Sequence, residues 1–154
     1  MAGSVSRAVV DAFFKVYAAR DPNKLEAFLH DDVVWTISGP VDVLSYCGTH
    51  RGKEAVLDLI LRTIPGIFCF TSYAQETLLV DGDQVAMLNR RSARRTADGR
   101  VISYRVANFM RFENGKVIAN LSLIDSFDAA EQILGHPLTV HVSPGIDAGD
   151  VVAL

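Results

Sequence analysis

Four long stretches in the second half of the chain have the composition of consecutive β-strands, and they limit the possible folds more than any other feature. They cover residues 68–80, 84–95, 100–113 and 116–125. The short segments between them contain Asp-Gly-Asp, Ala-Asp-Gly and Glu-Asn-Gly, whose glycine and asparagine residues supply the positive φ angles of tight turns. Strands joined by such short turns pair with their sequence neighbours, so we predict an antiparallel meander.

The first half of the chain has the periodicity of helices. Apolar residues recur at helical spacing from residue 4 to residue 19. Asp21 followed by Pro22 is a typical cap and first turn, and it predicts a second helix that ends near Leu29. The next stretch, residues 31–39, alternates apolar and polar side chains, which predicts one strand before the third helix.

A third helix is expected to run from Lys53 to Thr63 and to end at Pro65, because proline lacks the backbone N–H that a helix needs. A short closing helix is expected at 128–135, after the meander. Helices come first and the sheet second, which is typical of the α+β class rather than of an alternating α/β fold.

Composition restricts the classes of partner. The 154 residues are 49% hydrophobic, which suits one globular domain, and the net charge of -3 argues against nucleic acid or an acidic membrane surface as a partner. No stretch reaches the roughly 18 apolar residues that span a bilayer, and the N-terminus lacks a secretory signal, so we expect a cytoplasmic protein. We expect no metal, because ligand spacing is missing around Cys47, Cys69, His30, His136 and His141.

The segment Gly-Thr-His-Arg-Gly-Lys-Glu-Ala-Val, residues 48–56, has some features of a phosphate-binding loop. Three residues rather than four separate its glycines, and Glu54 stands where the motif needs a metal-binding hydroxyl. We therefore interpret Gly48 and Gly52 as turn residues in a loop, and Lys53 and Glu54 as exposed residues of a first helical turn.

A cluster of arginines occupies residues 90–100. Its spacing suits a hairpin with exposed basic side chains, which we interpret as a solvated edge that discourages the addition of further strands.

Three stretches resemble the nuclear transport factor two-like (cystatin-like cone) superfamily, in particular its SnoaL-like and ketosteroid-isomerase-like members. They are FFKVYAARDPNKLEAFLHDDVVWTISGP, YCGTHRGKEAV and FMRFENGKVIANLSLID, and together the resemblance covers roughly residues 5 to 134. It implies three N-terminal helices packed on a strongly curved, mainly antiparallel sheet, which form a cone with an interior pocket. The cone domain would span residues 1–135, followed by an irregular arm at 136–154.

The catalytic residues of these relatives transfer only in part. The base of the steroid isomerases falls at Ile37, and their two oxyanion donors fall at Phe13 and Asn108, of which only Asn108 can donate. The four site residues of the epoxide hydrolases fall at Trp35, Ile37, Val106 and Asn108. The resemblance therefore implies neither mechanism in full.

Two further residues could move a proton. SnoaL-type cyclases use an acid near the end of the last strand, and Asp125 is the nearest match; the same residue has the pattern of a helix cap, since Asp128 follows three positions later. His50 occupies an aromatic position of the family's Gly-x-x-x-Gly turn, where it would either titrate at the mouth of the pocket or lie on the surface. Both alternatives stay open for each residue.

Candidate binding residues combine an apolar body with a polar tip or lie on the inward face of a strand. They are Tyr17, Trp35, Tyr46, Tyr104, Asn120 and Ser122. Tyrosine and tryptophan suit a core as well as a pocket lining, whereas polar groups that face a core need partners.

Two classes of function fit these residues. The first is a cofactor-free isomerase, cyclase, hydrolase or dehydratase that acts on a small apolar, cyclic, polyketide-like or steroid-like molecule. In it Asp125 or His50 would move a proton and Asn108 would hold an oxyanion. The second is a binding or assembly domain whose pocket only holds such a molecule. The resemblance and the apolar strands also imply a homodimer through the convex sheet face.

Overall fold

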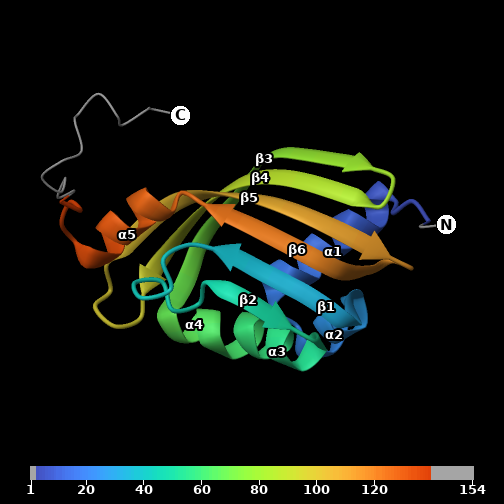
Figure 1. Ribbon diagram of the computed structural model, residues 1–154, viewed down its shortest axis with the longest axis horizontal. Helices are drawn as coiled ribbons and strands as arrows, with labels where there is room; N and C mark the ends of the chain where they lie inside the picture. The colour runs from blue at the N-terminus through green and yellow to red at the C-terminus, as the bar shows by residue number, and fades with distance from the viewer. Residues whose placement is uncertain (1–2, 140–154) are drawn as a thin grey trace, which may run out of the picture.

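The computed structural model describes residues 3–139 and has the predicted α+β architecture, with helices on one side of a six-stranded sheet (Figure 1). The helical elements are α1 (Arg7–Ala19), α2 (Pro22–Phe28), α3 (Lys53–Asp58), the π-helical η1 (Leu59–Thr63), α4 (Ile64–Ile67) and α5 (Ser126–Leu134). The strands are β1 (Leu29–Ser38), β2 (Gly48–Arg51), β3 (Phe68–Asp81), β4 (Gln84–Arg95), β5 (Val101–Glu113) and β6 (Lys116–Ile124).

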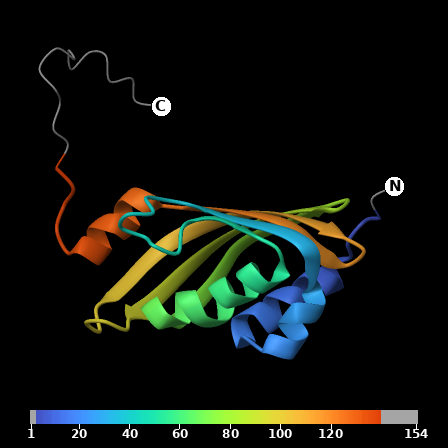
Figure 2. The same cartoon turned by 60° about the horizontal axis from the view of Figure 1, so that its bottom comes forward.

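The sheet has the strand order β2-β1-β6-β5-β4-β3, and β1 and β6 form its one parallel pair. The predicted meander is confirmed as the antiparallel series β3 to β6. Figure 2 shows how the sheet curls over α1 and the α3–α4 segment without closing into a barrel. The concave face is therefore covered by helices, and the side chains of that face form the core.

Local signals in the sequence account for the first two helices. The Ser6 side chain accepts a hydrogen bond from Val9 N at 3.3 Å, and Asp21 accepts one from Lys24 N at 3.2 Å, so both helices begin with a side-chain cap. Arg20 ends α1 in the left-handed region with φ 52°. Phe13 on α1 is fully buried, as the helical spacing predicts.

The third helix does not end before Pro65, so the predicted stop there was wrong. The helical segment continues through α4 to Ile67. The Ile64 N–H donates to Leu59 O, five residues back, which is the spacing of a π-helix. A proline clashes with the carbonyl four residues before it in a regular α-helix, and we attribute its tolerance here to the wider turn that precedes it.

Gly48 and Gly52 have φ angles of 105° and 84°, which favour glycine. Gly52 lies between β2 and α3 as the N-cap of α3, whereas Gly48, predicted as a turn residue, begins a strand. The residues between them were predicted as a loop, which was wrong. They form the edge strand β2, which pairs antiparallel with β1 and places His50 opposite Trp35. This register puts the His50 side chain on the same concave side as Trp35.

Lys53 is less solvated than the sequence suggests. Its side chain is 20% exposed and forms an ion pair with the Asp31 carboxylate, whereas Glu54 is exposed as expected. The hydrogen bond and the charge of Lys53 hold the pKa of Asp31 below its usual value. The first turn of α3 is thus tied to the start of β1.

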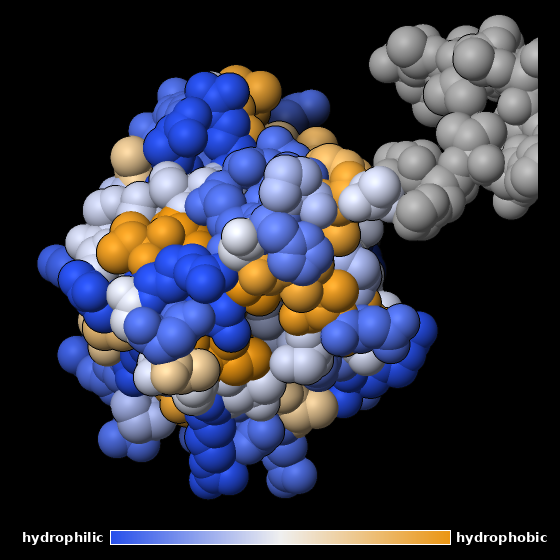
Figure 3. All heavy atoms as spheres, turned by 90° about the vertical axis from the view of Figure 1, so that its left-hand side faces the viewer, coloured by the Kyte–Doolittle hydropathy of each residue, from blue (hydrophilic) through white to orange (hydrophobic). Residues whose placement is uncertain are grey.

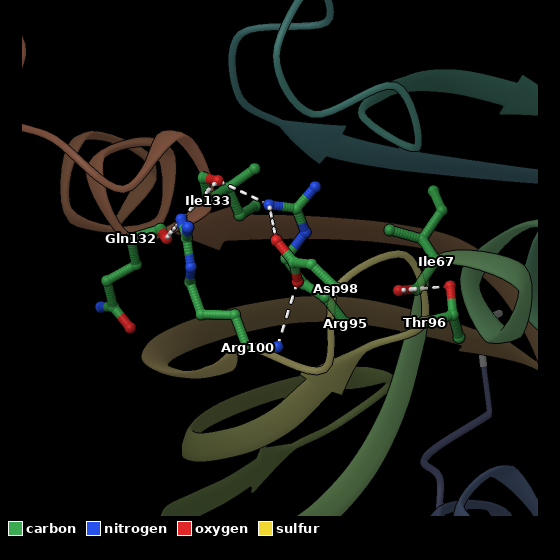
Figure 4. Close-up of polar contacts among 7 residues, drawn as sticks. All are labelled: Ile67, Arg95, Thr96, Asp98, Arg100, Gln132 and Ile133. Atoms are coloured by element: carbon green, nitrogen blue, oxygen red, sulfur yellow. Dashed lines mark hydrogen bonds and ion pairs between the residues drawn. The ribbon is translucent and has the colours of Figure 1, made fainter.

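The arginine-rich hairpin between β4 and β5 holds the last helix in place, a role that the interpretation as a solvated edge missed (Figure 4). Arg95 Nη1 donates to Ile133 O at 2.6 Å, and Arg100 Nη1 donates to Gln132 O at 3.3 Å. Asp98 pairs with Arg95 at 3.2 Å. Cations at the carbonyl end of a helix are favourable, so these contacts fix α5 across one end of the sheet. Figure 3 shows that end, where hydrophobic residues lie between hydrophilic ones.

The convex face carries an exposed apolar row. Phe109 is 50% exposed and is paired in register with Leu121 on one side and Ala86 on the other, and Ala86 is paired with Leu79. The row thus crosses four adjacent strands on the face that the helices leave uncovered.

The core contains a chain of buried polar side chains that runs across three strands. Asn89, Asn108, Asn120 and Ser122 are each at most 6% exposed. Asn89 Nδ2 donates to Asn108 Oδ1 at 3.1 Å, and Asn108 Nδ2 donates to Asn120 Oδ1 at 3.2 Å and to Ser122 Oγ at 2.7 Å. The inward position predicted for Asn108 is confirmed, and its amide partners are neighbouring side chains.

Two further expectations, on the C-terminal arm and on membrane-spanning helices, can be checked only for residues 3–139. The predicted arm at 136–154 falls mostly outside them, and residues 136–139 have no regular secondary structure. Between residues 3 and 139 no helix has the length and apolarity needed to cross a membrane.

We expect Asn108→Leu to lower the free energy of unfolding by about 2 kcal/mol or more. Each buried polar group left without a partner costs about 1–3 kcal/mol, and this change removes partners from Asn89, Asn120 and Ser122. Urea denaturation measures the effect. Met110→Leu, on the same strand and equally buried, is the matched control and should cost less than roughly 1.5 kcal/mol. Equal stability of the two variants would contradict this account of the core.

We expect an NMR titration to show an Asp31 pKa below its usual 3.8, and Lys53→Ala to remove the shift. Because the folded-state pKa is lowered, the pair stabilises the fold at neutral pH, and this contribution is lost as the pH falls through that pKa. Asp21 is the internal control, because its pKa is lowered by the Lys24 backbone N–H and should stay lowered in the variant. An unchanged Asp31 pKa in Lys53→Ala would rule the contact out.

Candidate functional site

A cleft of about 240 Å³ opens between α1, the edge strand β3 and its neighbour β4. Helix α1 contributes Phe14 and Tyr17, β3 contributes Phe70 and Tyr73, and β4 contributes Arg91. Arg20 and the smaller residues Ala18, Thr71 and Ser72 complete the lining, so the cleft offers an aromatic surface with two cationic groups.

Two smaller voids continue from the cleft toward the core, with volumes of about 20 Å³ and about 10 Å³. Tyr17 and Arg91 border the cleft and both voids. A space of this kind needs at least roughly 10–15 Å³ to hold one water molecule, so the larger void is big enough for water. Aromatic packing fills the rest of the interior, including a stacked pair of Tyr17 and Trp35 with ring centroids 6.0 Å apart.

Two arginines line the cleft, and Arg91 is the one that also borders both inner voids. It is paired in register with Tyr104 on β5 and with Tyr73 on β3, which places its side chain on the concave side of the sheet. Its guanidinium lies 5.5 Å from the ring centroid of Tyr73 and 5.8 Å from that of Tyr17, within cation–π range. In the part of the chain that the structure describes, Arg91 forms no ion pair with a carboxylate.

The surrounding hydroxyl groups remain protonated near neutral pH. Burial raises the pKa of Tyr104 and the pKa of Tyr73, and the charge of Arg91 only partly opposes the effect. An arginine keeps its charge in proteins. The site therefore presents a positive charge and several hydrogen-bond donors without a matching negative charge, which suits an oxygen acceptor or an anion.

Arg91 also determines how the side-chain amides of the buried polar chain are oriented. Its Nε donates to Asn89 Oδ1 at 2.8 Å, and a guanidinium can only donate. The Asn89 amide must then present its N–H groups to Asn108, and the Asn108 amide presents its own to Asn120 and Ser122. Both N–H groups of Asn108 are thus used within the protein, so this residue has no free donor for an oxyanion.

The residues predicted to bind a ligand all border the two inner voids. They are Tyr17, Trp35, Tyr46, Tyr104, Asn120 and Ser122. Asn108 borders the smaller void. The structure therefore gathers these residues from α1, the loop before β2 and the three strands β1, β5 and β6, and their contact with a ligand stays a prediction.

The two predicted proton carriers lie elsewhere. Asp125 is exposed at the N-cap position of α5, forms no side-chain cap hydrogen bond and does not border the cleft or the voids. His50 is partly buried beside Trp35, and its Nε2 has no hydrogen-bond partner within the described residues. None of the described side chains around the cleft and the two voids is an aspartate, a glutamate or a histidine. Residues 3–139 also contain no group of three potential metal ligands.

Sequence reasoning missed Arg91 and Asn89. Both are part of the alternating pattern of β4, in which Val85, Met87, Asn89 and Ala93 are buried. The alternation places Arg91 on the same inward face. The arginines were interpreted as one basic cluster, which hid the fact that neighbouring arginines on a strand point to opposite faces.

Comparison with solved structures finds the same fold. A protein from Rhodopseudomonas palustris, whose name proposes an isomerase activity, matches with a TM-score of 0.79 and 28% identity, over 86% of this chain and 100% of that chain. An NTF2-like protein from Burkholderia xenovorans matches with a TM-score of 0.70 and 23% identity, over 82% and 93%. An LEH-like epoxide hydrolase from M. tuberculosis matches with a TM-score of 0.66 and 19% identity, over 83% and 88%. A search of curated proteins finds no match.

The sequence itself matches a family through most of the fold. The match to the SnoaL-like domain extends over residues 10–120, from α1 to the middle of β6, and includes the helices and strands that enclose the cleft. The curled α+β sheet agrees with the NTF2-like cone of the structural neighbours. The chain belongs to the SnoaL-like domain family.

Proposed function

We propose that this protein binds a small, largely apolar molecule with a negatively charged or strongly polarised oxygen, in the cleft between α1, β3 and β4. The observation that carries the proposal is Arg91, a partly buried cation that borders the cleft and both voids and has no carboxylate partner among the described residues. Buried charges are costly unless they are paired, so a ligand oxygen is a favourable partner for Arg91.

The aromatic lining favours an apolar body for the ligand. Phe14, Tyr17, Phe70 and Tyr73 surround the cleft, and ligand pockets of this kind use aromatic contacts for affinity and a few polar groups for orientation. The opening at the surface admits a ring that then lies against Tyr17, with its oxygen directed toward Arg91.

A cofactor-free isomerase is the second candidate. The relative whose name proposes an isomerase activity is 28% identical and is covered completely by the alignment. Arg91 would stabilise an enolate in such a reaction, and His50, with its unpartnered Nε2 beside Trp35, is the nearest candidate base on the concave side. Binding is the better supported proposal, because no acid or histidine among the described residues borders the cavities.

We also propose that two copies of the chain associate through their convex faces. Leu79, Phe109 and Leu121 lie in one exposed row there, and Leu123 is exposed nearby. Large exposed apolar patches on soluble proteins mark interfaces, and a two-fold dimer would bring the same row of each copy together.

The ligand proposal predicts that the protein prefers an anion to a neutral molecule of the same shape. Cyclohexanecarboxylate should bind more tightly than cyclohexanecarboxamide by about 10-fold, because a hydrogen bond to a charged group contributes about 1.5–3 kcal/mol. Quenching of Trp35, the one tryptophan in the chain, measures binding, since Trp35 stacks on the Tyr17 ring that borders the cleft.

Arg91→Met should lower the preference for the carboxylate at least several-fold, and Arg20, the other arginine of the cleft lining, accounts for any preference that remains. Arg90→Met is the matched control, because Arg90 is the adjacent residue on the opposite face and pairs with Glu76 at 3.5 Å. The control should keep the preference. Equal binding of the two probes to the wild-type protein, or no binding at millimolar concentration, would contradict the proposal without any need for a variant.

The dimer proposal predicts a molar mass of twice 16.8 kDa in light scattering at micromolar concentration. Phe109→Glu places a charge at the centre of the apolar row and should yield monomers. Val41→Glu is the control, because Val41 is similarly exposed but lies in the loop between β1 and β2. A wild-type monomer would rule this interface out.

A further inference from the structure

We infer that the cleft binds a molecule with two separate anionic groups, one held by Arg20 and the other by Arg91, with an apolar ring between them. The inference rests on the proposed function, which places one anionic oxygen at Arg91. It adds a second charge and so names a chemical class of ligand, a ring dicarboxylate. The observation behind it is that two arginines, neither with a carboxylate partner among the described residues, line one aromatic cleft.

Both guanidinium groups lie against aromatic rings that line the cleft. Arg20 Cζ is 5.2 Å from the ring centroid of Phe70, and Arg91 Cζ is 5.5 Å from that of Tyr73. Both rings belong to the cleft lining, and both arginines are half-buried. A cation–π contact holds a guanidinium in place but does not neutralise its charge. Each arginine therefore still lacks an anionic partner.

A bulge in β3 turns both rings toward the cleft. Residues three apart on a regular strand point to opposite faces of the sheet. The register shifts between Phe70 and Ser72, which leaves Thr71 without a paired residue on β4. This extra residue changes the alternation, so that Phe70 and Tyr73 share the concave side. Three residues of strand span about 10 Å, a separation that suits two anionic groups on opposite sides of a ring better than two on neighbouring carbon atoms.

A backbone carbonyl of the helical segment also holds Arg20. Arg20 Nη1 donates to Ile60 O at 2.8 Å. In a regular α-helix the Ile64 N–H would donate to this oxygen, but here it donates to Leu59 O. At π-helical spacing the donor would be residue 65, which is a proline and has no N–H. Ile60 is buried, so Arg20 supplies a hydrogen bond that neither helical donor provides.

The backbone at Arg20 indicates that this position depends on its side chain. The residue ends α1 with φ 52°, a conformation in which glycine is the usual residue. An arginine here carries backbone strain, which the contacts of its guanidinium with Ile60 O and Phe70 offset. The second cation of the cleft is thus held in place before a ligand arrives, which lowers the entropy cost of binding.

The charges in the cleft favour a ligand with two anionic groups over one with a single anionic group. None of the described residues that line the cleft is an aspartate or a glutamate. A ligand with one carboxylate pairs with one arginine and leaves the other without a partner. A ligand with two separated carboxylates can pair with both Arg20 and Arg91 through charge-assisted hydrogen bonds.

The experiment compares three ligands on the chain of 154 residues at mildly alkaline pH, where every carboxyl group of the ligands is ionised. They are trans-cyclohexane-1,4-dicarboxylate, its monoamide, and cis-cyclohexane-1,2-dicarboxylate, which carries the same charge on neighbouring carbon atoms. Quenching of Trp35 measures binding. We expect the 1,4-dicarboxylate to bind about 5-fold more tightly than either of the others, because a partly exposed ion pair contributes up to about 1 kcal/mol.

Arg20→Met should remove the advantage of the 1,4-dicarboxylate over its monoamide. The variant should also have a lower urea midpoint, because Ile60 O loses its donor. Pro65→Ala separates the two roles, since alanine restores an N–H to the helix near Ile60 O. In that background Arg20→Met should lower the urea midpoint less, yet still remove the advantage. Lys15→Met is the control: it removes a positive charge from an exposed position of the same helix, outside the cleft lining, and should keep the advantage.

The outcomes distinguish this inference from the proposed function. If cyclohexanecarboxylate binds in an Arg91-dependent manner but the 1,4-dicarboxylate binds no better than its monoamide, the inference is overturned and the proposed function stands. Equal binding of the two dicarboxylates would also overturn it, because the effect would then reflect net charge alone, and so would an advantage that survives in Arg20→Met. If carboxylate binding does not depend on Arg91, the proposed function itself fails. The comparison of ligands on the wild-type protein remains decisive even if Arg20→Met does not fold.

Discussion

The hydrogen bond from Arg91 Nε to Asn89 Oδ1 determines which group donates and which accepts in each hydrogen bond of the buried polar chain. Because a guanidinium can only donate, this bond orients the Asn89 amide, and each later amide in turn accepts on one side and donates on the other. The chain crosses β4, β5 and β6 and ends at Ser122. A buried network of this kind is stable only when every member is satisfied, so the sheet's register and the site's donor groups depend on the same contacts.

The curled sheet makes this arrangement possible and limits the space inside it. Helices α1 and α3–α4 cover the concave face, and aromatic side chains such as Phe13 and Trp35 fill most of the interior. One cleft lies where α1 meets β3 and β4, with two small voids behind it, and another of about 180 Å³ opens where the loop before β2 meets β3 and α5. The packing that stabilises the fold therefore leaves little space in the middle of the cone.

Much of the fold could be predicted from local patterns. The four meander strands, the caps of α1 and α2 and the inward faces of β1, β5 and β6 follow from alternation, turn residues and capping residues. The errors occurred where the surrounding structure outweighed a local sequence rule. Pro65 was expected to end a helix that a π-helical turn allows to continue, and residues 48–51 were expected to be a loop although β1 offers them a strand partner.

By itself the sequence determined the class of the fold, the family and which face of each long strand is apolar, because these depend on periodicity and on residues close together in the chain. Only the tertiary structure decided which polar residues share a site. Arg91 and Ser122 are far apart in sequence, and they border one void because β5 lies between their strands in a curled sheet. The sequence left open whether Asp125 is a proton carrier or a helix cap, and whether His50 lies at the pocket mouth or on the surface. Neither residue borders the cleft or the two voids, because position along a strand does not fix what packs against it. Proximity between distant residues is set by strand order, curvature and packing, and no local pattern records these.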